Sequence, residues 1–151
     1  MTTLAYSRKE NVIAVDSRCT SGGIAISNKS NKWITKGKNV YFFCGDVADV
    51  ERLVDLIEDG IEQLEEGEHL DATVILALPD PMTFYVDNSI IKTYKLHYDD
   101  YTAYGTGAPW ALSAFDHGAT AKKAVEYAMT RDIYTGGKVV QYDLTKQRFK
   151  K

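Results

Sequence analysis

The sequence contains few of the residues that bind metals or form disulfides. It has two cysteines and three histidines among 151 residues. Cys19 and Cys44 do not form a CxxC pattern, and the histidines lie far apart, so the spacing disfavours a metal site. We expect no metal and no other cofactor.

Long apolar runs are also missing. No stretch approaches the roughly 18 apolar residues that a membrane-spanning helix needs. Arg8, Lys9 and Glu10 interrupt the beginning of the chain before the apolar core of a signal peptide could form. These absences favour a cytoplasmic protein, in a compartment where disulfides are rare and both cysteines remain free thiols.

The chain also lacks a large excess of charge of either sign. Its formal net charge is −3, so nothing favours nucleic acid or an anionic membrane as a partner. The chain ends in a basic segment that is better explained as a solvated tail than as a binding patch: Lys146, Arg148, Lys150 and Lys151. The length fits a single domain, residues 1–151.

What the sequence does contain is, first, a series of short strands. Alternating apolar residues on either side of a turn predict a hairpin from residues 2–7 and 12–16. A second hairpin is expected from residues 83–86 and 90–94, around Asp87-Asn88. The remaining strands are predicted at 24–27, 32–35, 40–44, 73–78, 102–104 and 138–144.

Helical patterns occur in three places. Apolar residues recur at helical spacing from Val50 to Leu64, so we expect a long helix from a cap at Asp46 to about residue 66. Pro109 opens a short helix that runs to about residue 115, and Thr120 caps another that runs to about residue 129. Because strands and helices are segregated along the chain, the pattern indicates an α+β fold with sheets covered by helices.

The first chemical signal is the threonine that follows Met1. Removal of Met1 would give Thr2 a free α-amino group, with an ordinary pKa of about 8, that can act as base for the Thr2 hydroxyl. A buried Asp16–Lys32 pair beside this amine makes chemical sense, because the lysine charge lowers the pKa of the amine while the aspartate orients the lysine. Taken alone, a Met-Thr start is common, and Asp16 with Lys32 is better explained as a surface ion pair.

Three glycine-containing segments supply further candidates. Gly45 lies between a buried strand and a helix, where its amide could face a developing oxyanion or simply form a turn. Thr106 lies between two glycines in a segment that could be a weak phosphate loop, although the Lys-Ser/Thr ending of such loops is absent. Asp132 and Thr135 come just before Gly136-Gly137. Each of these signals is weak by itself.

In their order and spacing, these signals together resemble the catalytic β subunits of proteasomes, and most of all the bacterial two-ring peptidase HslV and its relatives. The resemblance extends from Thr2 through the final strand. It implies the four-layer αββα sandwich of N-terminal-nucleophile (Ntn) hydrolases. One helical layer is expected to be reduced, because residues 67–71 lead directly into a strand where the family usually has a second helix.

The resemblance also implies a role for each site residue. Thr2 would be the nucleophile, with Asp16 and Lys32 beside it and the amide of Gly45 forming the oxyanion hole. The accessory hydroxyl and the late Asp–Ser pair of the family would fall on Thr106, Asp132 and Thr135, with a hydroxyl kept at both replaced serines. The S1 pocket that receives the substrate side chain would be lined by Cys19, Thr20, Ser30, Phe43 and Val47. With Phe43 at its floor, this pocket would prefer small or medium apolar side chains.

The implied function is a threonine endopeptidase that hydrolyses peptide bonds through an acyl ester on Thr2. Such a peptidase works as a homo-oligomeric ring or double ring, on unfolded polypeptides supplied by an AAA+ ATPase. Two alternatives remain open. One is a non-catalytic structural or interaction protein with the same fold, and the other is a small-molecule amidase of the same superfamily.

Four departures from the family pattern bear on this interpretation. The first hairpin is about two residues shorter than usual, which preserves side-chain alternation because the strand period is two. Asp46 follows Gly45 where a second glycine is common in the family. Its carboxylate would oppose negative charge at the oxyanion site unless it caps the helix instead. The reduced helical layer affects surfaces used for ring contacts and ATPase docking. Retention of Met1 would leave Thr2 without a free amine.

Overall fold

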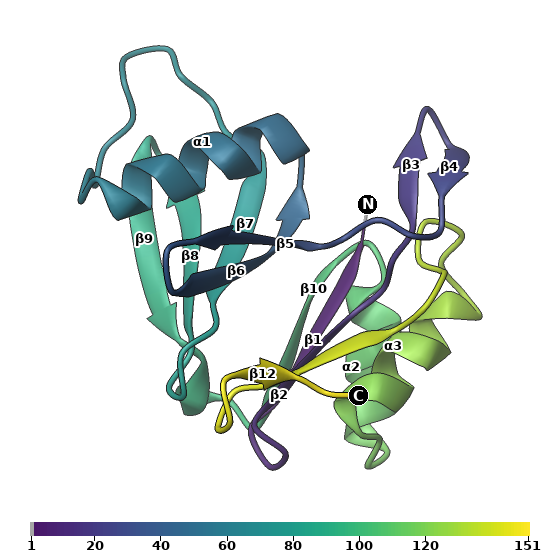
Figure 1. Cartoon of the computed structure of the whole chain (residues 1–151). Coiled ribbons are helices and arrows are strands. Elements are labelled where there is room, and N and C mark those ends of the chain that lie inside the picture. Colours follow the sequence, from purple (N-terminus) through teal and green to yellow (C-terminus); the bar gives the residue numbers. More distant parts are fainter. Residues whose placement is uncertain (1) are drawn as a thin grey trace.

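Two five-stranded antiparallel sheets stack face to face in the computed structural model, which describes residues 2–151 (Figure 1). The first sheet has the order β10-β1-β2-β11-β12 and the second has the order β5-β6-β7-β8-β9. The strands of the first sheet are β10 (Tyr101–Gly105), β1 (Thr3–Ser7), β2 (Val12–Val15), β11 (Val140–Asp143) and β12 (Arg148–Phe149). Those of the second are β5 (Trp33–Lys36), β6 (Asn39–Gly45), β7 (Ala72–Leu76), β8 (Met82–Asp87) and β9 (Ile90–Lys95).

Two smaller elements connect or flank the sheets. A short hairpin of β3 (Cys19–Ser21) and β4 (Ile24–Ser27) projects from the body of the molecule near the beginning of the chain (Figure 1). The 3-10 helix η1 (Leu96–Tyr98) leads from β9 of the second sheet to β10 of the first. The hairpin matters for the site described below, because it forms one side of a hollow at that end of the sandwich.

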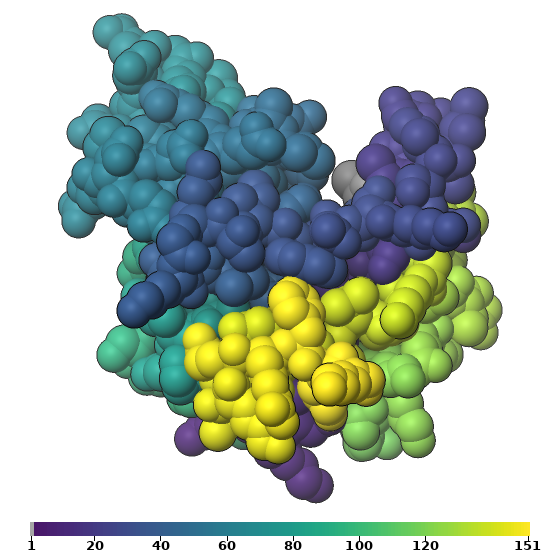
Figure 2. Space-filling model, in the orientation of Figure 1, coloured from purple at the N-terminus to yellow at the C-terminus, as the bar shows by residue number. Residues whose placement is uncertain are grey.

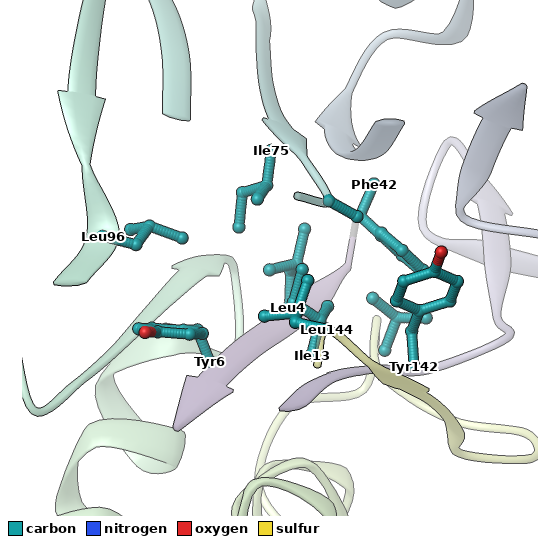
Figure 3. Packing of buried hydrophobic residues seen from close by; sticks show 10 residues of the cluster. Leu4, Tyr6, Ile13, Phe42, Ile75, Leu96, Tyr142 and Leu144 are labelled. Atoms are coloured by element: carbon teal, nitrogen blue, oxygen red, sulfur yellow. The ribbon is translucent and has the colours of Figure 1, made fainter. Parts of the chain in front are cut away.

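Apolar side chains from both sheets meet in the space between them. Leu4 and Ile13 from the first sheet pack with Phe42 and Ile75 from the second, and all four are almost completely buried (Figure 3). Because side chains alternate along a strand, Ala5 faces the opposite side of the first sheet and belongs to a different cluster. Burial of this shared apolar surface is the main force that holds the two sheets together.

Helices cover the outer face of each sheet. The helix α1 (Val47–Glu58) packs Val50, Leu53 and Val54 against the second sheet. The helices α2 (Ala108–Asp116) and α3 (Ala121–Met129) pack small residues such as Ala111 and Ala124 against the first sheet. The result is a four-layer αββα sandwich with one helix on one side and two on the other, which confirms the predicted α+β fold with one helical layer reduced. No helix within residues 2–151 is long and apolar enough to span a bilayer.

The long helix ends about eight residues earlier than its apolar periodicity predicts. Asp46 caps its start as expected, since the carboxylate accepts hydrogen bonds from the amides of Ala48 and Asp49. At the other end Gly60 takes a left-handed conformation with φ of +71°, and the amide of Ile61 bonds back to the carbonyl of Leu56 over 2.9 Å. This is a Schellman ending, which a helical pattern cannot extend through.

The residues just beyond Gly60 do not continue the helix as predicted. Leu64 is buried because residues 62–64 run beside the tip of the β8–β9 hairpin, where the amide of Leu64 bonds to the carbonyl of Ser89 over 2.8 Å. The expected tail is also corrected. The chain turns back after residue 143 to form β12, and the ring of Phe149 packs 4.7 Å from that of Trp33 while the basic side chains stay exposed.

Replacement of Gly60 by alanine tests where α1 ends. No atom lies within 4 Å of the added Cβ, so the substitution acts only through the backbone. At a left-handed position alanine lowers the free energy of unfolding by about 1 kcal/mol. Inside a continuous helix it would instead raise that free energy by about 1 kcal/mol. Urea unfolding therefore decides the matter by the sign of the change, and stabilisation would show that the helix continues past Gly60.

Candidate active site

A completely buried carboxylate organises one end of the sandwich. Asp16 directly follows β2, and its Oδ1 accepts hydrogen bonds from the Thr2 hydroxyl at 2.8 Å and the Thr3 amide at 3.1 Å. Its Oδ2 accepts from the amides of Arg18 at 3.2 Å and Gly136 at 3.1 Å. A buried charge requires this full set of donors, and the set comes from three separate parts of the chain.

The predicted nucleophile lies at the start of this network. Thr2 is only 2% exposed, and its hydroxyl donates to Asp16 directly. The sequence predicts Asp16 as the partner that orients Lys32, and it does not predict this direct contact between Asp16 and Thr2. Gly105, at the end of β10, presses against the carbonyl of Thr2 so closely that a Cβ there would collide with it. Thr2 is thus fixed by a carboxylate on one side and a glycine backbone on the other.

Lys32 lies on the same side of the molecule, immediately before β5. Its side chain is largely buried, and burial lowers the pKa of its ammonium group while the nearby charge of Asp16 opposes that shift. The carbonyl of Lys32 accepts a hydrogen bond from the amide of Phe43 at 3.0 Å, which ties the residue to β6. The structure therefore brings together Thr2, Asp16 and Lys32, the three residues predicted to carry the chemistry.

Thr2 and Lys32 line a cavity of about 590 Å³, and Asp16 lies buried behind Thr2. Figure 2 shows the hollow at this end of the molecule, between the β3–β4 hairpin and the start of α1. Thr2, Lys32 and Gly45 line it together with every residue predicted for the substrate pocket: Cys19, Thr20, Ser30, Phe43 and Val47. A cavity of similar size, about 510 Å³, lies elsewhere around Arg8 and Phe115, so the polar groups and not the volume distinguish this one.

The strand-to-helix turn at Gly45 forms one wall of the cavity. Gly45 is exposed and has φ of +118°, and a Cβ there would run into the backbone of Asp71 and Ala72, so the position requires glycine. It lies at the N-terminus of α1, where the helix dipole favours negative charge. The carboxylate of Asp46 is engaged as the cap of α1, at 3.0 Å from the amide of Ala48. The Asp46 carboxylate therefore lies close to Gly45 because it caps the helix.

The remaining predicted residues form a second network behind the first. The hydroxyls of Thr106 and Thr135 each donate to Oδ2 of Asp132 at 2.6 Å. The hydroxyl of Thr135 also lies 2.7 Å from that of Thr3. The network therefore reaches the residue after the predicted nucleophile, and Thr3 is a buried member of the site that sequence reasoning missed.

Both cysteines also belong to the cavity wall. Cys19 is one of the residues predicted for the pocket, whereas the sequence pattern places Cys44 at the end of a buried strand. Burial raises the pKa of the Cys44 thiol to about 11, which keeps it uncharged at neutral pH. Among the described residues 2–151, no cluster of three or more His, Cys, Asp or Glu side chains is arranged to hold a metal ion.

Comparison with known proteins identifies this architecture. The chain superimposes on eukaryotic HslV from Trypanosoma brucei with a TM-score of 0.73, at 19% identity, covering 93% of this chain and 97% of that one. It also matches the Thiobacillus denitrificans protein BPH with a TM-score of 0.66, at 21% identity, covering 93% and 96% of the two chains. The same BPH in complex with epoxomicin gives a TM-score of 0.67 at 19% identity, covering 93% and 97%. The chain has the Ntn-hydrolase fold of HslV and the proteasome β subunits.

Sequence comparison points in the same direction over a shorter span. Proteasome subunit beta 1 of Pyrococcus abyssi (strain GE5 / Orsay) is 38% identical over a 72-residue alignment, which covers 38% of this chain and 36% of that relative. The matched part therefore spans about a third of the relative's length. No protein-family model matches the chain. The resemblance to the proteasome and HslV proteins that the residue pattern suggested is confirmed.

Residues to which the sequence assigned no role of their own hold the loops of this candidate site together. Arg18 donates from Nε to Asn28 at 2.8 Å and from Nη1 to the carbonyl of Ile133 at 2.8 Å. The hydroxyl of Ser17 donates to the carbonyl of Lys138. Gly136 fits against the guanidinium of Arg18 with no room for a Cβ. The late Asp-x-x-Thr-Gly-Gly segment was the available signal, because its paired glycines indicated a closely packed turn.

A pair of alanine substitutions tests the close contact between Gly105 and Thr2. Gly105 and Gly118 both have positive φ, but only at Gly105 would the added Cβ meet another part of the chain. We expect Gly105→Ala to lower the free energy of unfolding by about 1–3 kcal/mol more than Gly118→Ala, the usual cost of overpacking. Urea unfolding of both variants measures the difference, and equal losses would show that the Gly105 contact is not tight.

Proposed function

We propose that this chain is a threonine peptidase in which the hydroxyl of Thr2 is the nucleophile after removal of Met1. Met1 lies outside the described residues. The observation that supports the proposal most is the convergence of Thr2, Lys32 and Gly45 on one cavity, with the buried Asp16 behind them. A hydroxyl, a buried cation and a helix N-terminus are the groups that acyl transfer needs.

Removal of Met1 would create the base for this reaction. The freed α-amine of Thr2 takes the proton of the Thr2 hydroxyl as the oxygen attacks the substrate carbonyl. The positive charge of Lys32, buried close to Asp16, lowers the pKa of that amine and stabilises the alkoxide that develops. In the structure the Thr2 hydroxyl donates its one proton to Asp16 over 2.8 Å, so the hydroxyl turns that proton toward the freed amine before the attack begins.

The amide of Gly45 then donates a hydrogen bond to the carbonyl oxygen as negative charge develops on it, and the dipole of α1 stabilises the same charge. Collapse of the tetrahedral intermediate breaks the peptide C–N bond, and the leaving amine takes the proton from the α-amine of Thr2. A water molecule, activated by the same amine, hydrolyses the ester on Thr2 and releases the second product.

The walls of the cavity favour an apolar substrate side chain. Phe43 is almost completely buried at the cavity wall, and Val47, which starts α1, also lines the cavity and is 52% exposed. An apolar side chain of small or medium size would cover this apolar surface, which is favourable by the hydrophobic effect. The preference is tested with a panel of peptides, and a clear preference for basic side chains would contradict it.

Peptide hydrolysis by matched variants tests the proposed function. We expect the protein without Met1 to hydrolyse fluorogenic peptides with apolar P1 residues. Thr2→Ala and Lys32→Met should each lower kcat/KM by at least about 1000-fold, as removal of a central catalytic group does, while Thr2→Ser retains activity. Lys36→Met is the control, because Lys36 forms a surface ion pair with Asp55 and lies outside the cavity. Activity that survives in Thr2→Ala would refute the proposal.

We further propose that copies of the chain assemble into a ring, whose enclosed chamber receives unfolded polypeptides from an ATP-dependent unfoldase. In such a ring each copy would contact the next one head to tail, through two different surfaces, and the charge distribution supports this arrangement. Residues 46–71, which include α1 and the loop after it, carry 11 of the 21 acidic residues and one of the 18 basic ones. Residues 145–151, which include β12, are exposed and carry four basic residues and no acidic one. Surfaces of opposite sign at different places on one chain favour a heterologous contact, which generates a ring when the rotation between neighbouring copies closes.

Charge reversal tests this assembly. We expect Glu62→Lys/Glu66→Lys and Arg148→Glu/Lys150→Glu each to dissociate the oligomer in sedimentation velocity at low salt, because each opposes like charges across the contact. A mixture of the two variants should reassemble, because each reversed surface then meets its complement. A mixture that does not reassemble would show that the two surfaces do not contact each other. Oligomers that persist in both variants would also rule out this contact.

A further inference from the structure

The residue after the proposed nucleophile is held as firmly as the nucleophile itself. Thr3 is completely buried. Its amide donates to Oδ1 of Asp16 at 3.1 Å, and its carbonyl accepts from the amide of Asp16 at 3.3 Å. The backbone of Thr3 is therefore attached to the same carboxylate oxygen that receives the Thr2 hydroxyl.

The side chain of Thr3 points into the second network. The hydroxyl of Thr135 gives its single proton to Oδ2 of Asp132 at 2.6 Å. Because a hydroxyl has only one proton, Thr135 must accept the hydrogen bond that joins it to Thr3, at 2.7 Å. Thr3 is then the donor at the start of a chain of hydrogen bonds that passes through Thr135 and ends on the buried carboxylate of Asp132.

The backbone at Gly107 packs closely around the hydrogen bond between Thr3 and Thr135. A Cβ on Gly107 would collide with Oγ1 of Thr3 and would lie 3.0 Å from Oγ1 of Thr135. The glycine at position 107 thus provides the space in which the two hydroxyls meet. The other carboxylate oxygen of Asp132 accepts from the amide of Tyr134 at 3.1 Å, so the aspartate is fixed as well.

We propose that Thr3 is a positioning residue, which transmits the fixed position of Asp132 to Thr2. Asp16 holds the backbone of Thr3 and Asp132 holds its side chain, so the peptide that carries the Thr2 hydroxyl cannot rotate. This inference rests on the proposed function, because what Thr3 positions is the proposed nucleophile. It assigns the Thr106, Asp132 and Thr135 network a mechanical role that acts through residue 3.

Kinetics of Thr3 variants test the proposal. Thr3→Val removes the hydroxyl at nearly constant volume and should lower kcat for peptide hydrolysis by about 10- to 100-fold, the loss that a misplaced reacting group causes. KM should stay within about twofold, because the cavity walls are unchanged. Thr3→Ser keeps the hydroxyl and should recover most of the activity. Intact mass must show that each variant has lost Met1.

Thr83→Val is the matched control. Thr83 is 2% exposed, and its hydroxyl lies 3.1 Å from that of Tyr104, away from the cavity. Its replacement should cost similar stability and leave kcat unchanged. If Thr3→Val lowers activity no more than Thr83→Val does, or if Thr3→Ser does not recover it, Thr3 is only a core residue and the proposal is wrong.

Hydrogen exchange provides a test that does not depend on activity. The amide of residue 3 donates to Asp16, and NMR should show it exchanging at least about tenfold faster in Thr3→Val than in the wild type or Thr83→Val. Thr135→Ala breaks the same contact from the other side and should have the same effect, which covers the case that Thr3→Val does not fold. Unchanged exchange in these variants overturns the proposal. If the wild type hydrolyses no peptide but Thr3→Val and Thr135→Ala both show the faster exchange, only the proposed function is refuted.

Discussion

The carboxylate of Asp16 is completely buried, and a buried charge is stable only when hydrogen-bond donors surround it. The donors come from the start of the chain, from Arg18 and from Gly136, segments that the fold must bring to one point. Once they are there, the Thr2 hydroxyl has a fixed place, and the loop after α3 is attached to the loop after β2. The arrangement of the proposed active site follows from the need to satisfy this one group.

The sandwich provides the edge at which these segments meet. β1 begins at residue 3 in the first sheet, and β6 ends at Gly45 in the second, so the start of the chain and the start of α1 face each other across the cavity. Glycines at 45, 105 and 107 allow backbone and side chains to approach more closely than any other residue would permit. The two sheets therefore hold the proposed nucleophile, the buried Lys32 and the proposed oxyanion site around one cavity.

Much of this fold could be predicted from local pattern, because hairpins, caps and the segregation of strands and helices leave clear signals. The end of α1 could not, since apolar residues at 61 and 64 continue the helical spacing past Gly60, although Ile61 is exposed and Leu64 is buried beside the β8–β9 hairpin. β3 and β12 are too short to show a period. The site residues were each ambiguous alone and became interpretable only as an ordered set. Thr3 was missed because nothing local distinguishes a second threonine from the first.

Intact mass after incubation with epoxomicin, the compound present in one of the related BPH structures, tests the central claim most directly. We expect a wild-type mass without Met1 that increases by a single epoxomicin, with the adduct mapped to Thr2 and absent from Thr2→Ala. A protein that has lost Met1 and remains unmodified would contradict it. So would an adduct that forms equally in Thr2→Ala, because the reactive group would then lie elsewhere.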